Sequence, residues 1–249
     1  MAIDAQWSNV VLFMPMDSDG IVDVKNHTPT LVGGVTVSAT QSLTGGYSAY
    51  FDGTDDRITF PASADWDMSG GTFSFEFSIR PDALPSGATC RLFMIGANGS
   101  ASALTVAIST AGSLYMVVPS GSPPGATTAT GVVVAGVWNR FEISVNAGQA
   151  RIFKDGSLVA GPTAMTLPTS SSSNQLYIGW DTVSTVDFKY AGYLDRVRFT
   201  KGSYRNIADF TSDDDPFPRP TISGTVYDSV GAETDNVIVA LKRSTMALA

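Results

Sequence analysis

The sequence predicts an all-β protein, an antiparallel two-sheet sandwich of the jelly-roll type. Apolar residues recur at every second position in many short runs, which is the period of a half-buried strand. The 24 glycines and 13 prolines separate these runs, and no segment shows the period of an amphipathic helix. With 249 residues, 43% hydrophobic and 15% charged against a usual charged share of about 25%, the chain can bury a large core.

The N-terminal quarter predicts four short strands. Val10–Met14 is an apolar run that ends at a turn over Met16–Gly20, and Val35–Ala39 alternates apolar and polar residues. Gly46–Pro61 then has alternating residues on both sides of the Gly/Asp turn Asp52–Asp56, which is typical of a β-hairpin. We therefore expect the two halves of Gly46–Pro61 to pair with each other.

Phe73–Ile79 is the clearest strand, because four large apolar side chains alternate with polar ones. Such a face needs an opposing sheet, since burial stabilises each side chain by roughly 1.5–3 kcal/mol. Glu76 falls on the other face, where we expect a solvated side chain. Leu194 breaks the alternation of the last long strand and predicts a β-bulge near Asp195, whose carboxylate should accept backbone hydrogen bonds. Further strands are expected at Leu92–Ile95, Ala103–Ile108, Ser113–Val118, Trp138–Val145, Arg151–Lys154, Leu176–Trp180 and Tyr190–Phe199.

The C-terminal part differs in composition. Residues 212–220 hold three carboxylates and three prolines and predict an extended linker. Thr221–Tyr227 and Val237–Lys242 alternate cleanly, as two strands of an incomplete second β module. Two strands are not stable alone, so either the native chain continues or these strands pair with a neighbouring subunit. We expect a sandwich domain over residues 1–217 and a β extension over 221–249.

The charge balance limits the partners. A net charge of −8 and a pI of about 4.5 argue against nucleic acid, whose phosphates need clustered Lys and Arg, and against an anionic membrane surface. The N-terminus lacks the pattern of a signal peptide, and no apolar run approaches 18 residues, so we expect no membrane insertion.

The residues that carry most enzyme chemistry are scarce. A single cysteine, Cys90, excludes an intrachain disulfide and a cysteine zinc site, and we expect it to be a small buried side chain. His27 is the only histidine and lies among loop residues, so we do not expect a catalytic triad. The three glutamates, Glu76, Glu142 and Glu233, do not have the spacing of a glycosidase pair. We expect a protein that is not an enzyme.

Several stretches resemble the laminin-G-like, concanavalin A-like jelly-roll domain, most closely the version in tailed-bacteriophage virion proteins. The resemblance covers roughly residues 7–217. It is carried by WSNVVLFMPMD, TQSLTGGYSAYFDGTDDRITFP, GGTFSFEFSIRP, VWNRFEISV, IFKDGSLV, LYIGWD and YAGYLDRVRFTKGSYR. The opening segment Trp7–Asp17 and the closing segment Phe199–Pro218 point to phage. The tail TISGTVYDSVGA similarly resembles the start of an Ig-like module that follows this domain in phage tail proteins.

The resemblance implies two kinds of ligand. Laminin-G-like domains sometimes hold calcium at the rim, and Asp17 with Asp19, or Asp55 with Asp56, offer carboxylates. Turn-capping aspartates explain both clusters equally well, so we name no metal ligand and expect no other cofactor.

Sugar binding needs an exposed aromatic ring with polar neighbours. Trp66 lies in a polar loop beside two aspartates and is the candidate ligand-binding residue; the other aromatic candidates are Trp180, Tyr115 and Tyr190. Trp138 and Trp180 are expected in the core.

Two functions follow from these observations and the resemblance, and we expect the first, with the second as the alternative. The first is a structural or decorating component of a bacteriophage virion, in the tail or head, that forms a homo-oligomer and contacts other virion proteins. The second is a carbohydrate-binding protein that recognises glycans on the host surface.

Overall fold

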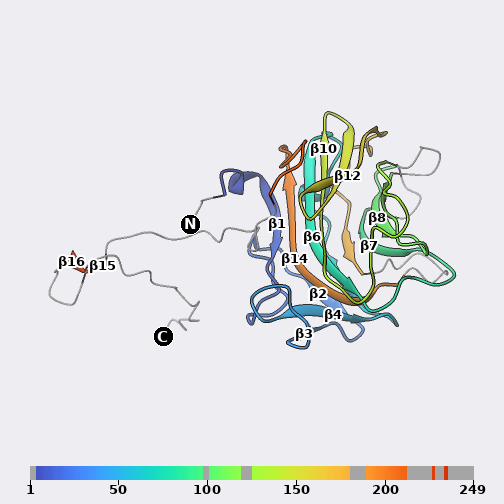
Figure 1. The fold of residues 1–249 in the computed structure, drawn as a ribbon. Coiled ribbons are helices and arrows are strands. Elements are labelled where there is room, and N and C mark those ends of the chain that lie inside the picture. Colours follow the sequence, from blue (N-terminus) through green and yellow to red (C-terminus); the bar gives the residue numbers. More distant parts are fainter. Residues whose placement is uncertain are drawn as a thin grey trace. The chain divides into compact units, whose positions relative to one another are not determined.

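The computed structural model describes residues 4–97, 101–118, 125–179 and 189–211, and the backbone of Val226–Tyr227 and Glu233–Thr234. The predicted all-β class is confirmed: the described residues form two antiparallel sheets and only two short 3-10 turns, η1 (Trp7–Asn9) and η2 (Ala64–Trp66). Figure 1 shows β6, β10 and β14 in one layer and β7 and β8 in the other. The fold is a concanavalin A-like jelly-roll sandwich.

The larger sheet has eight strands. In spatial order they are β12 (Ser157–Ala164), β11 (Gln149–Lys154), β10 (Asn139–Asn146), β6 (Phe73–Pro81), β14 (Ala191–Lys201), β4 (Ser48–Asp52) and β3 (Thr36–Ser38), with β1 (Val10–Met14) also paired to β14. The six-stranded sheet has the order β2 (Thr30–Val32), β5 (Arg57–Phe60), β13 (Leu176–Ile178), β7 (Cys90–Ile95), β8 (Leu104–Ile108) and β9 (Leu114–Val117).

The core lies between the inner faces of the two sheets. The alternating side chains of β6, from Phe73 to Ile79, are all buried there, as the sequence predicts. Phe93 of the smaller sheet joins the two layers, because its ring centroid lies 4.9 Å from that of Phe77 and 5.5 Å from that of Phe199. Side chains alternate across a strand, so the residues between these core positions point to the outer face of the eight-stranded sheet.

The predicted hairpin at Gly46–Pro61 is wrong. β4 pairs with β3 and β14 in the larger sheet, whereas β5 pairs with β2 and β13 in the smaller one, so Asp52–Asp56 is an arch that crosses between the sheets. Phe51 before the arch and Ile58 after it both enter the core. The alternation is therefore the same as in a hairpin, although the two strands are not neighbours.

Two tight turns join neighbouring strands of the larger sheet. Ala147 and Gly148 both have positive φ, 48° and 75°, and join β10 to β11; Asp155 and Gly156, at 49° and 84°, join β11 to β12. Two successive residues with positive φ match the twist of paired antiparallel strands. Both hairpins are therefore fixed by local turn chemistry.

β14 changes its partner along its length. Its first residues, up to Leu194, pair with β4, and its last residues, from Val197 on, pair with β1. Between them the register with β6 shifts from Asp195 to Arg198, and Arg196 has a φ of 54°. The predicted bulge at Asp195 is confirmed, and it lies where β4 gives way to β1.

The outer face is covered at one end. Residues 202–211 return over it: the Arg205 backbone N–H donates to Ser74 Oγ (2.9 Å), and Phe210 packs on Phe153 of β11 with ring centroids 5.5 Å apart. Gln6, just before η1, donates from Nε2 to the Tyr204 carbonyl (3.1 Å). We call residues 202–211 the covering segment.

The chain divides into two compact units, residues 6–216 and a second made of residues 1–5 and 217–249. In the second unit the structure describes β15 (Val226–Tyr227) and β16 (Glu233–Thr234), which pair antiparallel. The predicted linker 212–220 and most of the two predicted C-terminal strands lie outside the described residues, and the domain boundaries stay a prediction. No helix in the described part of the chain has the length and apolarity to span a membrane.

Candidate functional site

Four residues on the outer face lie in register across β3, β4, β14 and β6. Thr36 is opposite Tyr50, Tyr50 is opposite Tyr193, and Tyr193 is opposite Arg80. Thr36 is exposed, and the other three side chains are half-buried. We call this set the open row, because it lies beyond the covering segment.

The two tyrosines form the centre of the open row. Their ring centroids are 4.8 Å apart at an interplanar angle of 43°, and the Arg80 guanidinium lies 5.8 Å from the Tyr193 centroid. Strand pairing fixes the backbone under all three side chains, so little conformational freedom is left to lose on binding. The row offers a rigid aromatic surface with a cation beside it.

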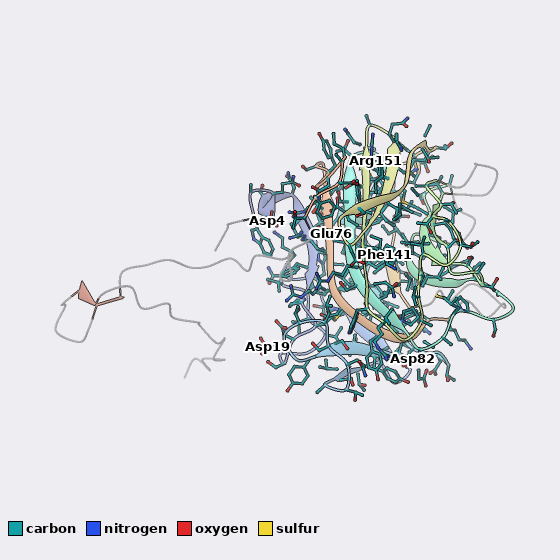
Figure 2. The ribbon with its side chains drawn as sticks, viewed as in Figure 1. Asp4, Asp19, Glu76, Asp82, Phe141 and Arg151 are labelled. Atoms are coloured by element: carbon teal, nitrogen blue, oxygen red, sulfur yellow. The ribbon has the colours of Figure 1, made fainter. Side chains whose placement is uncertain are left out.

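Acidic side chains border this surface. Asp52 and Asp82 follow Tyr50 and Arg80 by two residues and so lie on the same face. Figure 2 shows Asp82 at one end of the sheet. Asp82 accepts a hydrogen bond from Arg80 Nη1 (3.4 Å). Desolvation, followed by the nearby charge of Asp82, raises the pKa of Tyr50, so its hydroxyl stays a neutral donor and acceptor.

The acidic arch next to the open row was one of the two clusters considered for calcium. Asp52, Asp55 and Asp56 each place a carboxylate oxygen within 4.8 Å of the others. Both oxygens of Asp56 accept backbone hydrogen bonds, from Gly34 and from Asp52, and Asp52 Oδ1 accepts from the Thr54 N–H (2.6 Å). These bonds shape the arch and use the carboxylates as turn caps, so the cluster does not by itself fit a metal site.

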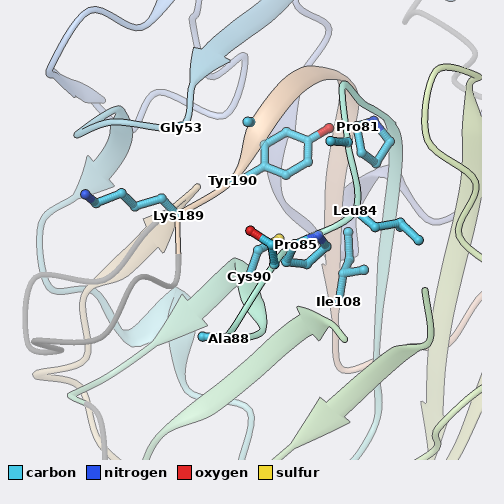
Figure 3. Close-up of a pocket in the computed structure, with 12 residues that line it drawn as sticks. Gly53, Pro81, Leu84, Pro85, Ala88, Cys90, Ile108, Lys189 and Tyr190 are labelled. Atoms are coloured by element: carbon cyan, nitrogen blue, oxygen red, sulfur yellow. The ribbon is translucent and has the colours of Figure 1, made fainter. Parts of the chain in front are cut away.

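A pocket of about 230 Å³ opens beside the arch (Figure 3). Its lining offers both polar and apolar surface and includes Pro81, Leu84, Cys90, Ile108, Lys189 and Tyr190. The Tyr190 hydroxyl donates to the Tyr193 carbonyl (2.8 Å), and burial raises the pKa of the Cys90 thiol to about 12. Cys90 is a buried apolar side chain, as predicted, and its protonated thiol is a poor nucleophile.

The structure places Trp66 in the core. Its side chain has no exposed surface, its Nε1 donates to the Pro61 carbonyl (3.0 Å), and its ring packs on Phe60 and His27. The expectation of an exposed ring is therefore wrong. The neighbouring aspartates suggest a solvent-exposed loop. The η2 turn nevertheless directs the Trp66 indole into the core.

The other predicted aromatic candidates are spread over the molecule. Tyr190 is buried, Tyr115 is half-buried on β9 of the other sheet, and Trp180 lies outside the described residues. Trp138, expected in the core, is half-buried. Tyr50 and Tyr193, which form the open row, were missed because strand register brings them together and sequence alone does not give register.

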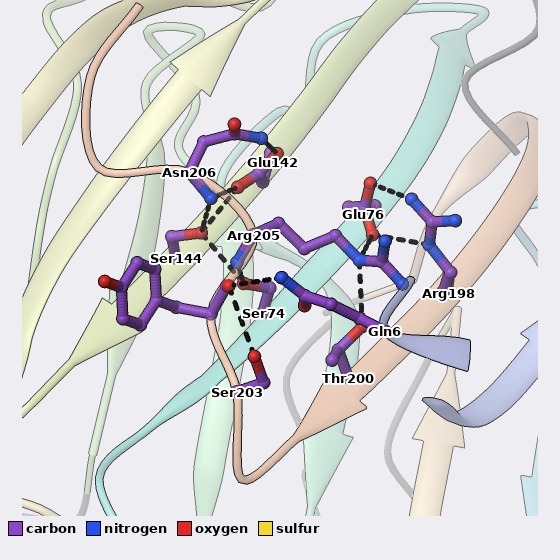
Figure 4. Close-up of polar contacts among 11 residues, drawn as sticks. Gln6, Ser74, Glu76, Glu142, Ser144, Arg198, Thr200, Ser203, Arg205 and Asn206 are labelled. Atoms are coloured by element: carbon purple, nitrogen blue, oxygen red, sulfur yellow. Dashed lines mark hydrogen bonds and ion pairs between the residues drawn. The ribbon is translucent and has the colours of Figure 1, made fainter. Parts of the chain in front are cut away.

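The structure brings together two glutamates that sequence spacing kept apart. Glu76 and Glu142 are opposite each other on β6 and β10, on the outer face beneath the covering segment (Figure 4). The expectation of a solvated Glu76 is wrong: it is buried and bound by Arg198, whose Nε donates to Oε2 (2.6 Å), and by Arg205 (3.1 Å). The covering segment supplies Arg205 and buries the outer face of β6 at this position.

Glu142 is bound as fully as Glu76. Asn206 donates to it from its backbone N–H (2.9 Å) and from Nδ2 (2.7 Å), and Ser144 Oγ donates at 2.5 Å. Burial, with a further contribution from the charge of Glu76, raises the pKa of Glu142 to about 7. A raised pKa suits a general acid, but the covering segment occupies the space that a substrate would need.

His27 bridges two aspartates. Its Nδ1 lies 2.6 Å from Asp23 Oδ2 and its Nε2 lies 2.9 Å from Asp65 Oδ2. Asp23 is buried and also accepts from the Phe13 and Lys25 N–H groups, at 2.9 and 3.0 Å. The cluster ties the loop after β1 to the η2 turn, which is a structural role.

A family model described as the concanavalin A-like lectin/glucanases superfamily, in its laminin-G form, matches residues 52–204. The chain belongs to this family. The match covers β6, β10 and β14, which together carry Arg80 and Tyr193 of the open row and both buried glutamates. No curated protein matches the chain.

Solved structures with this fold include carbohydrate-binding proteins. Domain 4 of AbnA, an extracellular arabinanase from Geobacillus stearothermophilus, in complex with arabinotriose, is 15% identical with a TM-score of 0.59, over 79% of this chain and 94% of that chain. A botulinum neurotoxin type C structure, described as dependent on two ganglioside molecules for cell entry, is 11% identical with a TM-score of 0.61, over 80% and 49%. Trypanosoma rangeli sialidase in complex with sialic acid is 14% identical with a TM-score of 0.57, over 80% and 31%. The chain thus spans about half of the toxin chain and a third of the sialidase chain, and these identities show the fold alone.

Proposed function

We propose that the sandwich is a non-enzymatic glycan-binding domain whose binding surface is the open row. The observation that carries this proposal is the pair of half-buried tyrosines, whose rings are in contact at an angle of 43°, with Arg80 beside them and Asp82 at the border. A sugar ring has an apolar face of C–H groups, which packs on an aromatic ring, and hydroxyls, which bond to charged side chains. The open row supplies both kinds of contact on a rigid sheet.

Two further findings support a binding role. The arabinanase domain, the neurotoxin and the sialidase that share this fold are each described with a sugar ligand or a ganglioside. Glu76 and Glu142 are the two carboxylates that most resemble a glycosidase pair. They are buried beneath the covering segment and bound by Arg198, Arg205 and Asn206. A screen on bacterial polysaccharides should therefore show no turnover, and turnover would contradict the non-enzymatic role.

A glycan array with the wild-type chain and two matched variants tests the binding surface. Tyr193→Ala should lower the affinity for any glycan bound by wild type at least tenfold, because it removes one of the two tyrosine rings at the centre of the open row. Tyr115→Ala removes a half-buried tyrosine from the other sheet and should leave the affinity unchanged.

Both variants must first show the circular dichroism and unfolding midpoint of a folded protein. The proposal fails if wild type binds no glycan, or if the two variants lose binding equally.

The place of action is a finer proposal. We propose that the domain works on a bacteriophage virion, where it recognises host-surface glycans and contacts other virion proteins as a homo-oligomer. The support is the resemblance of Trp7–Asp17 and Phe199–Pro218 to phage segments. Electron microscopy of antibody-labelled particles tests it, and particles without label would overturn the location while leaving the glycan proposal intact.

A further inference from the structure

The pocket beside the acidic arch lies at the same end of the larger sheet as the open row. Ala191 lines the pocket and is opposite Asp52 on β4. Two residues further along β14, Tyr193 is opposite Tyr50. Because side chains alternate across a strand, Ala191 and Tyr193 share the outer face and lie about 7 Å apart along it. A ligand that packs on the tyrosines can therefore extend into the pocket.

Small residues line the passage from the open row to the pocket. Gly53, in the arch, lies against Ala191: a Cβ placed on Gly53 would be 2.7 Å from the Ala191 Cβ. Gly53 also has a φ of 77°, which residues with a side chain rarely adopt. A larger side chain at either position would narrow the passage, so the local geometry of the arch keeps it open.

The size and lining of the pocket fit one substituent of a sugar. Its volume of about 230 Å³ is below the roughly 300–1,000 Å³ of pockets that enclose a whole drug-sized ligand. Ile108 and Cys90 are buried (Figure 3), and the Cys90 thiol, whose pKa is raised to about 12 by burial, is uncharged. Leu84 is half-buried, and Ser86 is exposed and offers a hydroxyl. A short group with a methyl end and a polar amide matches this lining.

The charges beside the passage disfavour an acidic sugar. Asp52 is opposite Ala191, and the Asp82 N–H donates to the Ala191 carbonyl (3.1 Å). Both aspartates are exposed, and after desolvation their charges are among the causes that raise the pKa of Tyr50. A sugar carboxylate would be repelled by both, whereas a neutral substituent would not. Lys189 also lines the pocket, so an acidic sugar is the competing ligand that the experiment has to include.

We propose that the pocket binds the acetamido group of a sugar whose ring packs on Tyr193, so that the domain prefers N-acetylhexosamines to the corresponding hexoses. This inference rests on the proposed glycan-binding function and adds the class of sugar. The methyl group packs on Leu84 and Ile108, and the Ser86 hydroxyl donates to the acetamido oxygen. One additional carbon in a fitted apolar pocket changes affinity by about 10- to 200-fold.

A glycan array with matched sugars tests the preference. One set ends in glucose, N-acetylglucosamine or glucuronic acid, and the other in galactose, N-acetylgalactosamine or galacturonic acid, each on the same linker. We expect wild type to bind an N-acetylated member at least about tenfold more tightly than its hexose, and the uronic acid no more tightly than the hexose. If wild type binds no glycan, the proposed function fails. If it binds glycans without this preference, or prefers the uronic acid, only this inference fails.

Three variants locate the preference in the pocket. Ala88→Phe places a ring among the lining residues and should reduce the preference to less than about threefold. Ala62→Phe adds the same ring at an exposed position after β5, at the end of that strand away from the arch, and should keep the preference. Ser86→Ala should weaken binding of the N-acetylated sugar alone, by roughly threefold to tenfold.

Circular dichroism and thermal unfolding must first show that each variant is folded. Ser86 is exposed, so Ser86→Ala keeps the test decisive if Ala88→Phe does not fold. The inference is overturned if folded Ala88→Phe keeps the full preference, if Ser86→Ala binds the N-acetylated sugar as wild type does, or if Ala62→Phe loses the preference.

Discussion

The outer face of the eight-stranded sheet has two ends with opposite chemistry. At one end, Glu76 and Glu142 are buried beneath the covering segment and bound by Arg198, Arg205 and Asn206. At the other, Tyr50 and Tyr193 are half-buried beside Arg80 and keep part of their surface exposed. Figure 2 shows the two ends through Glu76 and Asp82, which lie at different levels of the sheet.

The two ends of the outer face differ because of the covering segment and not because of the strands. A single strand, β6, holds both Glu76 at the buried end and Arg80 in the open row, four residues further on. Both side chains occupy outward positions of the same alternation. A charged residue on a strand therefore becomes part of the interior or part of a binding surface according to which loop crosses above it.

The largest expected effect on stability comes from a substitution at the covered end of the outer face. Arg198→Met should lower the free energy of unfolding by about 3–5 kcal/mol, because it leaves Glu76 buried without its two-pronged partner. Urea unfolding measures the loss. The double variant with Glu76→Gln should recover part of it, since the buried charge is then gone. A loss under about 1 kcal/mol would show that this end is solvated and would remove the contrast.

The next effect is a pH dependence set by Glu142. Its pKa in the folded protein, about 7, lies above the ordinary 4.5, so the folded state binds the proton more tightly than the unfolded state. The resulting stability is fully present below pH 4.5 and is lost as the pH rises through 7, by about 3 kcal/mol. Glu142→Gln should flatten this fall relative to wild type in urea unfolding from pH 4.5 to 8. Parallel curves for the two proteins would contradict the burial of this carboxyl.

The smallest effect on stability is expected at the open row. Arg80 and Asp82 are 3.4 Å apart, with side chains 21% and 41% exposed, and a pair of this kind contributes at most about 1 kcal/mol. Arg80→Ala should thus leave the unfolding free energy nearly unchanged while it weakens glycan binding. A loss of several kcal/mol would mean that the open row, like the other end, belongs to the interior.

The strands could be predicted from the sequence because alternation is a local property. Phe73–Ile79 alternates strictly and is the central strand β6, and the single break at Leu194 marks the bulge. The same locality explains the error at Asp52–Asp56. A strand that returns beside its predecessor and one that crosses to the opposite sheet both present alternate apolar residues to the core, so the pattern is identical.

The candidate site was less predictable, because it depends on what lies above a strand. Tyr50 and Tyr193 are far apart in the chain, and only their register makes them neighbours. Glu76 occupies a position that looks solvated until the covering segment supplies Arg205. The error at Trp66 is the opposite one. Its polar neighbours in the sequence predict an exposed side chain, but the residue is buried in the core.

The pairing of β1 with β14 sets an order of events during synthesis. Val10 is opposite Thr200, and β14 lies between β6 on one side and β4 and β1 on the other. Until residues 191–201 have been made, β1, β4 and β6 lack the strand that joins them. Such long-range closure is slow and leaves strand edges exposed. The eight-stranded sheet can therefore be completed only when almost all of the domain has been synthesised.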